Sequence, residues 1–249
     1  GKSDRRSRRR YRIRHRDDQF AGLQVSFEQT LEELLRLDLA LTGKAHAEAE
    51  QKGSRGLSTA DADLVRSSLG PLVAIAPVRF VEAPVLLRGR ESSARVVATN
   101  SQYAAVTDFR AAEGRFLSDL DAADAKRVAV LGASVARDLF GFQSALGRHI
   151  RIGDDEYTVV GLMESKRVRE GRATVIRVRD INRDVYIPIR TASARFPLAR
   201  DAGAIDELAI QVKDADEVAA VAPIVTRLIR GTHHGADDFE VVVPAELLA

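Results

Sequence analysis

The sequence predicts an α+β protein in which a strand-helix-strand unit at each chain end encloses a middle part of short strands. Three observations support this. The first hundred residues give strand, helix and strand signals in that order, the last third repeats them, and short apolar runs separated by turns lie between. Two such units form a ferredoxin-like sandwich, so the middle strands are predicted to be inserted into it. No internal sequence repeat accompanies the two units.

The first predicted elements lie within residues 23–100. LQVSF (residues 23–27) predicts a strand, a helix is expected over residues 26–40, and residues 43–56 are an expected exposed connection. Ser58 and Asp61 have capping-box spacing, which predicts a helix that ends near Ser68. Gly70 and Pro71 stop that helix. The Val- and Ile-rich run over residues 72–87 then predicts a strand, with Pro77 and Pro84 at bends or at an edge. A turn at residues 89–93 leads from it into residues 95–99, so the two segments are predicted to form a hairpin.

The middle and last parts continue this pattern. In the middle part a single short helix is expected, with Ser134 as its N-cap and Gly141 just past its end. A second helix starts after Asp214 and carries Pro223, which should kink it. Strands are predicted at residues 127–131, 149–152, 157–162, 175–178, 185–189, 207–212 and 239–243.

Composition limits the chemistry. The 249 residues contain 38 Lys and Arg against 36 Asp and Glu and no cysteine, which excludes disulfides, thiolate metal sites and a cysteine nucleophile. No window has the roughly 18 apolar residues of a membrane span, and no secretory leader pattern opens the chain. We therefore expect a soluble piece, whole or cut from a longer protein.

Arginine dominates the first 18 residues, which we interpret as a flexible basic arm. Such an arm can bind nucleic acid, attract anionic lipid headgroups, or act as a solvated spacer. Tyr11 is its only aromatic residue, so lipid proximity or a spacer ranks above nucleic acid.

No catalytic set is evident. RVAVLGASVARDLFG has a strand, a glycine and a helix start, as phosphate-binding turns do, but it lacks the three spaced glycines, and strand-to-helix packing is the favoured interpretation. His233, His234, Asp237 and Asp238 are the best metal-like group. Adjacent ligands in one loop rarely close a metal site, so a polar loop between helix and strand is favoured, and we assign no catalytic, cofactor or metal residue.

An ordered series of motifs from Leu57 onward resembles the MacB-type periplasmic core domain of ABC-transporter permeases. The series runs LSTADADLVRS, LVAIAPV, VVATNSQY, AEGRFLSDLDAADAKRVAVLGASVARDLFG, ALGRHIRIGDDEYTVVGLM, DVYIPIRTA and HHGADDFEVVVP. Four glycines in it occupy predicted strand ends or turns and are expected to be scaffold residues: Gly132, Gly147, Gly153 and Gly161.

The resemblance implies a porter-like α/β subdomain made by both chain ends and an inserted β-rich subdomain. The implied parts are the basic arm (1–18), the first porter-like part (19–100), the insert (101–194) and the second porter-like part (195–249). It also implies a non-enzymatic extracytoplasmic domain, without cofactor, that transmits ATPase-driven motion to substrate export or to partner regulation.

Implied partners are a cytoplasmic ABC ATPase, reached through membrane helices outside this chain, a second copy in a homodimer, and a periplasmic adaptor or other envelope protein. Nucleic acid is not among them. Two alternatives stay open: a cytosolic nucleic-acid-associated protein that uses the arm, and a metal-dependent hydrolase built on His233, His234 and Asp238.

Overall fold

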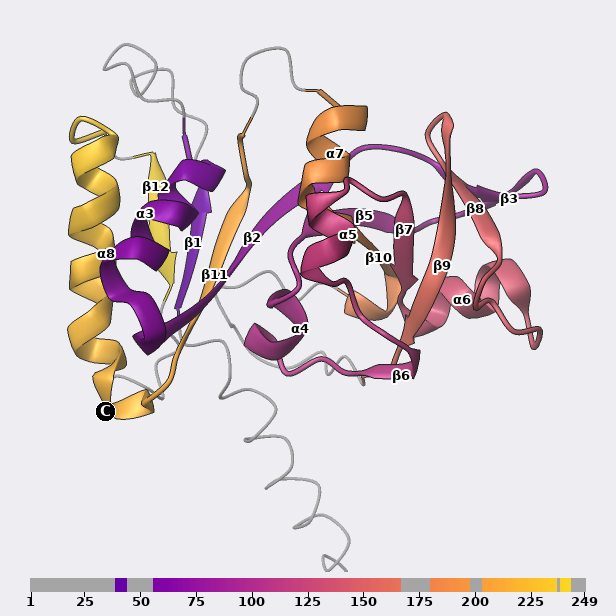
Figure 1. Cartoon of the computed structure of the whole chain (residues 1–249), viewed down its shortest axis with the longest axis horizontal. Coiled ribbons are helices and arrows are strands. Elements are labelled where there is room, and N and C mark those ends of the chain that lie inside the picture. Colours follow the sequence, from indigo (N-terminus) through magenta and orange to yellow (C-terminus); the bar gives the residue numbers. More distant parts are fainter. Residues whose placement is uncertain (1–38, 44–55, 167–179, 198–202, 237, 243–249) are drawn as a thin grey trace, which may run out of the picture. The chain divides into compact units, whose positions relative to one another are not determined.

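The computed structural model describes residues 39–43, 56–166, 180–197, 203–236 and 238–242 (Figure 1). The described residues form a mixed α+β domain with a single connected sheet of twelve strands. The strands are β1 (Leu39–Gly43), β2 (Val73–Val81), β3 (Val85–Leu87), β4 (Arg90–Ser92), β5 (Arg95–Thr99), β6 (Ala111–Gly114), β7 (Val128–Leu131), β8 (His149–Ile152), β9 (Asp155–Met163), β10 (Asp184–Pro188), β11 (Glu207–Val212) and β12 (Phe239–Val242).

Six α-helices and three short 3₁₀ turns are described. They are α3 (Thr59–Leu69), α4 (Tyr103–Val106), α5 (Asp119–Ala123), α6 (Ala133–Phe140), α7 (Ile189–Arg195), α8 (Val218–Thr232), η1 (Gly70–Leu72), η2 (Ile181–Arg183) and η3 (Ala215–Glu217). The predicted basic arm and the predicted strand over residues 175–178 lie outside the described residues.

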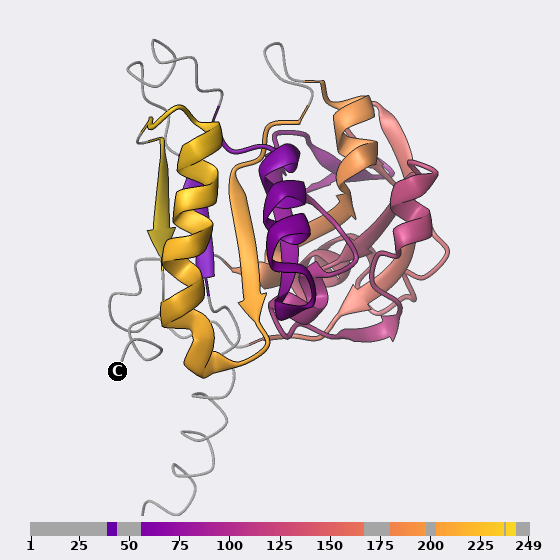
Figure 2. The ribbon, with the colours of Figure 1, turned by 60° about the vertical axis from the view of Figure 1, so that its left-hand side comes forward.

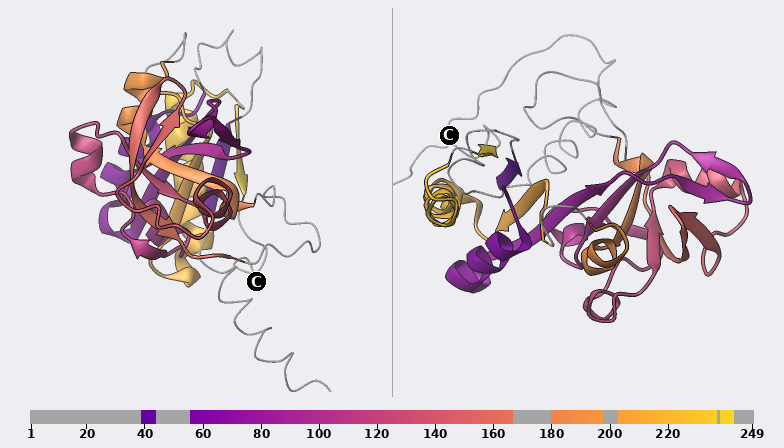
Figure 3. Two further views of the ribbon diagram at one scale, coloured as in Figure 1. Left: turned by 90° about the vertical axis from the view of Figure 1, so that its right-hand side faces the viewer. Right: turned by 90° about the horizontal axis from the view of Figure 1, so that it is seen from above.

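Both ends of the chain contribute to one end of the sheet. The strand order is β12-β1-β11-β2-β5-β10-β7-β9-β8-β3-β4, with β6 beside β9, and the first four strands are antiparallel to their neighbours. Helices α3 and α8 lie side by side and cover the same face of these four strands (Figures 2 and 3). These four strands and two helices form two strand-helix-strand units, β1-α3-β2 and β11-α8-β12; the second has the predicted elements, and the first differs from the prediction in its first strand.

The first strand of this group is not where we predicted it. Residues 23–27 lie outside the described residues, and β1 occupies the position beside β11. Leu39 and Ala40, the predicted end of a helix, are strand residues. The strand is stabilised by pairing with β11 on one edge and β12 on the other, and helical spacing within the segment cannot reveal those distant partners.

Strand β2 joins this group to the rest of the sheet. Its first residues pair with β11, and from Arg79 onward it pairs with β5. Pro77 lies before the β5 pairing begins, where the Thr99 hydroxyl donates to the Pro77 carbonyl at 2.8 Å. At Pro77 the strand side that faces β5 is hydrogen-bonded by a side chain and not by a backbone ladder. The proline therefore removes no ladder hydrogen bond there, which explains how a central strand tolerates it.

The predicted turn after β2 is a separate hairpin. Strands β3 and β4 are joined by Arg88 and Gly89, both with positive φ (48° and 80°), the geometry of a tight two-residue hairpin turn. Strand β3 also pairs with β8, which places this hairpin at the end of the sheet order, with β4 as the edge strand. The predicted pairing of the 72–87 run with residues 95–99 is present as β2 with β5.

Two helix predictions were wrong in detail. Helix α6 begins at Ala133 with Gly132 as its N-cap, so Ser134 lies inside the helix and caps nothing. The single helix expected in the middle part is also wrong: α7 follows β10, and α5 was missed although Ser118 and Asp121 form a full capping box. The five residues of α5 are too few for an apolar period to be visible. By contrast, the predicted box of Ser58 and Asp61 caps α3.

Close backbone approach requires glycine at two of the predicted scaffold positions. A Cβ on Gly132 would lie 2.4 Å from the carbonyl oxygen of Asn182, and one on Gly161 would lie 2.0 Å from that of Arg115. Gly161 lies within β9, at a bulge, and not at a strand end as predicted. Gly147 and Gly153 have positive φ in turns, as predicted.

Candidate functional site

The structure brings together two of the four metal-like residues. His233 and Asp238 are buried and in contact, whereas His234 is exposed with a left-handed backbone (φ 52°) and Asp237 lies outside the described residues. The third member of the buried cluster is Asp61, from the opposite end of the chain. Sequence reasoning assigned Asp61 only a capping role, because no local signal links residues that lie 172 positions apart.

Three elements position this cluster. Asp61 is in the first turn of α3, His233 follows the last turn of α8, and Asp238 precedes β12. The Nε2 atom of His233 lies 3.2 Å from Oδ2 of Asp61, and its Nδ1 atom lies 2.7 Å from Oδ1 of Asp238. The Thr232 hydroxyl donates to the other oxygen of Asp61 at 3.0 Å.

In this cluster, which we call the ion triad, the His233 ring lies between two carboxylates, an arrangement that favours its protonated form. Its hydrogen bond to Asp61 raises the pKa of His233 above the usual value, and this effect outweighs the opposing effect of burial. Burial alone would raise the pKa of Asp61, but hydrogen bonds from His233 and Ser58 outweigh it and lower the pKa. A protonated ring donates from both nitrogens, so in that form neither nitrogen has a lone pair for a metal.

We infer that the triad stabilises the contact between α3, the end of α8 and the start of β12. Among the residues that the structure describes, no group of three His, Cys, Asp or Glu side chains has the geometry of a metal site. His233 and Asp238 lie where α8 leads into β12, so these two residues form a polar link between helix and strand.

The segment that resembles a phosphate-binding turn joins β7 to α6. The N–H of Gly132 donates to the Asp184 carbonyl at 2.8 Å, and the Asn182 carbonyl lies against the same glycine. Backbone oxygens thus approach the position where a phosphate would sit. The geometry is that of strand-to-helix packing, the interpretation favoured from the sequence.

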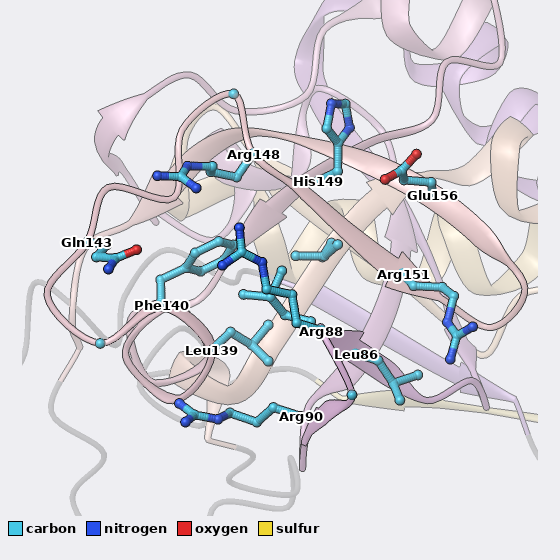
Figure 4. Close-up of a pocket in the computed structure, with 15 residues that line it drawn as sticks. Leu86, Arg88, Arg90, Leu139, Phe140, Gln143, Arg148, His149, Arg151 and Glu156 are labelled. Atoms are coloured by element: carbon cyan, nitrogen blue, oxygen red, sulfur yellow. The ribbon is translucent and has the colours of Figure 1, made fainter.

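Sequence reasoning missed a groove of about 900 Å³ beside the β3–β4 hairpin (Figure 4). Its walls are the hairpin, the end of α6, the loop that follows, and β8. Four arginines line it: Arg88, Arg90, Arg148 and Arg151. The available signal was weak: β8 alternates exposed His149 and Arg151 with buried Ile150 and Ile152, but nothing local indicates that β3 pairs with this strand.

The described residues thus combine a mixed sheet to which both chain ends contribute, an arginine-lined groove and an internal ion triad. Comparison with known proteins gives the family. The sequence profile of the MacB-like periplasmic core domain matches residues 20–228, and the chain belongs to this family. The resemblance found in the motifs is therefore confirmed.

Curated relatives and solved structures agree with this family match. The chain is 27% identical over 209 residues to the pyoverdine export ATP-binding/permease protein PvdT of Pseudomonas syringae pv. syringae, covering 84% of this chain and 30% of that protein. It is 30% identical over 187 residues to the macrolide export ATP-binding/permease protein MacB of Rhodospirillum rubrum, covering 74% of this chain and 27% of that protein. The chain thus spans less than a third of the length of these relatives.

The fold matches the periplasmic region of MacB from Actinobacillus actinomycetemcomitans with a TM-score of 0.68 at 16% identity, covering 86% of this chain and 94% of that one. It matches the extracellular domain of the transporter YknZ from Gram-positive bacteria with a TM-score of 0.65 at 17% identity, over 82% and 98%. The chain is thus a periplasmic domain of the kind that ABC-type export permeases carry. Within the described ranges, no helix has the length and apolar character needed to cross a bilayer.

Proposed function

We propose that this domain transmits ATPase-driven motion of an export permease to events outside the membrane, and that it does so without catalysis. The observation that carries the proposal is the position of β1 and β12, strands from opposite ends of the chain, as hydrogen-bonded neighbours. Flanking membrane helices that move would therefore act on adjacent strands of one sheet. A continuous ladder of hydrogen bonds passes such a displacement on with little local deformation.

We further propose two working parts. The porter-like part, with ferredoxin-like strand order, is assigned to residues 19–100 and 195–249, and the β-rich insert to residues 101–194. The strands β12, β1, β11 and β2 with α3 and α8 support the first part. Pairing of β3 with β8 and of β5 with β10 suggests that residues 85–99 move with the insert, so the division falls within β2.

The proposed partners follow from the domain architecture of the relatives. Their names describe ATP-binding/permease proteins, so a cytoplasmic ABC ATPase is expected to act on this domain through membrane helices. We also propose that two copies face each other in a homodimer, and that a periplasmic adaptor or another envelope protein receives the motion. The domain would be held at the extracytoplasmic side of the cell membrane.

Spin labelling of the full-length permease tests the mechanical function. The chain has no cysteine, so Phe142→Cys, at an exposed site after α6, introduces one label site per copy of this domain. We expect the distance between the labels of two copies to change between the nucleotide-free and ATP-bound states. An unchanged distance in a permease that still hydrolyses ATP would contradict the proposal.

A second pair of labels provides the control. Ala60→Cys on α3 and Ala220→Cys on α8 place two labels on exposed residues of helices that pack together in one copy. This distance should stay constant through the ATPase cycle, because the ion triad holds the two helices together. Movement here would mean that the porter-like part deforms and does not move as a unit.

A further inference from the structure

We propose that the arginine-lined groove is a binding site for an anionic amphiphile whose head carries a phosphate group. This inference goes beyond the mechanical function and does not depend on it. It rests on the charge, the free arginines and the apolar floor of a groove that the motifs of the sequence did not indicate.

The groove has a strongly one-sided charge. Four arginines line it against a single acidic residue, Glu156 (Figure 4). All four arginines are exposed. They come from two separate segments, residues 88–90 around the β3–β4 turn and residues 148–151 at the start of β8, which the pairing of β3 with β8 holds side by side. Positive charge is thus concentrated by the fold and not by a run in the sequence.

Within the part of the chain that the structure describes, the guanidinium groups in this groove have no acidic partners. Arg88, Arg148 and Arg151 form no ion pair with any residue that the structure describes, and Arg90 makes only a long hydrogen bond of 3.4 Å to the carbonyl of Asp138. Arginines elsewhere on the described surface commonly do form ion pairs: Arg66, Arg110, Arg115, Arg127, Arg183 and Arg195. Free guanidinium forks match the oxygens of a phosphate, with which they form paired, charge-assisted hydrogen bonds.

The backbone at Arg88 supports the same inference. Its φ of 48° is left-handed, a conformation that a tight hairpin turn normally fills with Asn, Asp or Gly. An arginine there adopts a less favourable backbone conformation, and the structure offers no ion pair among the described residues in return. Unfavourable backbone conformations of this kind concentrate at binding sites.

The floor of the groove is apolar. Leu139 and Ile150 are buried beneath it, and Leu86 and Phe140 are half-buried along it. In Figure 4, Arg88, Arg148, Phe140 and Leu139 line the same pocket. A charged rim above an apolar floor fits a ligand with an anionic head and a hydrocarbon tail, and the volume of about 900 Å³ is within the range of small-molecule sites.

Calorimetric titration of the full chain at low salt with three probes tests the class of ligand. The probes are octyl phosphate below its micelle concentration, inorganic phosphate, and octyl glucoside, which has the same tail without charge. We expect octyl phosphate to bind at least about tenfold more tightly than inorganic phosphate, since each buried methylene adds roughly fourfold. Octyl glucoside should bind at least about tenfold more weakly than octyl phosphate, because it lacks the charge-assisted hydrogen bonds.

Paired variants test the location. Arg88→Gln with Arg148→Gln should weaken octyl phosphate binding at least about tenfold, because two charge-assisted contacts are lost. Arg66→Gln with Arg190→Gln removes the same charge from exposed sites outside the groove and should change the affinity less than about twofold. Leu86→Gln should reduce the preference for octyl phosphate over inorganic phosphate while leaving phosphate binding unchanged.

Several results would overturn the proposal. Equal affinity for inorganic and octyl phosphate would indicate a simple anion site, equal affinity for octyl glucoside would indicate unspecific tail binding, and equal losses in both arginine pairs would place the binding elsewhere. No detectable heat with any probe would also refute it. Circular dichroism of each variant verifies that the fold is intact. Because the substituted arginines are exposed, a selective loss of octyl phosphate binding would not be due to misfolding.

Discussion

His233 lies between two buried carboxylates, so its replacement should destabilise the protein. His233→Gln removes the central charge and leaves Asp61 and Asp238 facing each other in a buried environment. We expect the free energy of unfolding to fall by roughly 3 kcal/mol near pH 5.5, because breaking a buried ion pair strands the remaining charge. Urea unfolding followed by circular dichroism measures this. His234→Gln, at the exposed neighbouring site, should change it by less than about 0.5 kcal/mol.

The same residue predicts how stability depends on pH. The folded pKa of His233 is raised above 6.5, so its stabilising contribution is full below 6.5 and is lost as pH rises through the folded pKa. The pKa of Asp61 is lowered below 3.8, so its contribution is lost as pH falls below 3.8. The cost of His233→Gln should therefore be smaller at pH 9 than at pH 5.5. An equal cost at both values would mean that the imidazole is neutral in the fold.

At the scale of elements, the two serines near α5 and α6 differ in a way that can be measured. The Ser118 hydroxyl caps α5 by accepting a hydrogen bond from the backbone N–H of Asp121. The carboxylate of Asp121 is buried and paired with Arg115. Burial would raise the pKa of Asp121, but its hydrogen bonds with Arg115 and Ser118 lower it to about 2. Ser118→Ala should cost about 1 kcal/mol of unfolding free energy.

Ser134→Ala is the matched control, because Ser134 lies inside α6 and caps nothing. Its effect on the urea midpoint should be negligible or slightly stabilising, since alanine has the higher helix propensity. A larger cost at Ser134 than at Ser118 would mean that the sequence-based assignment of the cap was right and the geometry of α6 is different.

The glycine that joins β7 to α6 gives a second comparison between elements. Gly132→Ala places a methyl group 2.4 Å from the Asn182 carbonyl oxygen, so the backbone must shift, and we expect a cost of at least about 3 kcal/mol in thermal unfolding. Gly231→Ala, in α8, meets no atom within 4 Å and should stabilise the helix by up to about 1 kcal/mol. Similar costs at both sites would contradict the close packing at Gly132.

Local signals predicted the elements whose cause is local. The capping box of α3 and the strand over residues 207–212 were predicted because their hydrogen bonding or period lies within a few residues. Strand β1 and the role of Asp61 were not predicted, because both depend on partners more than 160 positions away. The groove escaped prediction for the same reason, since its arginines come from two segments that only the β3–β8 ladder joins.

For the whole molecule, the continuous sheet predicts cooperative unfolding of its two proposed parts. One buried apolar cluster includes Val65 of α3 and Val225 of α8 together with Ile150 and Tyr157 of the insert, and β2 pairs with strands of both parts. Neither part can open without exposing core of the other. A destabilising change in the porter-like part should therefore destabilise the insert equally.

A dye on Phe142→Cys, the one cysteine of such a variant, reports on the insert, while far-ultraviolet circular dichroism reports on the whole chain. In urea, both signals should give the same midpoint, and adding His233→Gln should lower both midpoints by the same amount. His233 is in the porter-like part, so a dye signal that keeps its midpoint while the dichroism transition broadens would reveal two independent units. In that case the sheet could not pass motion from the chain ends to the groove as one body, and the division within β2 would act as a hinge.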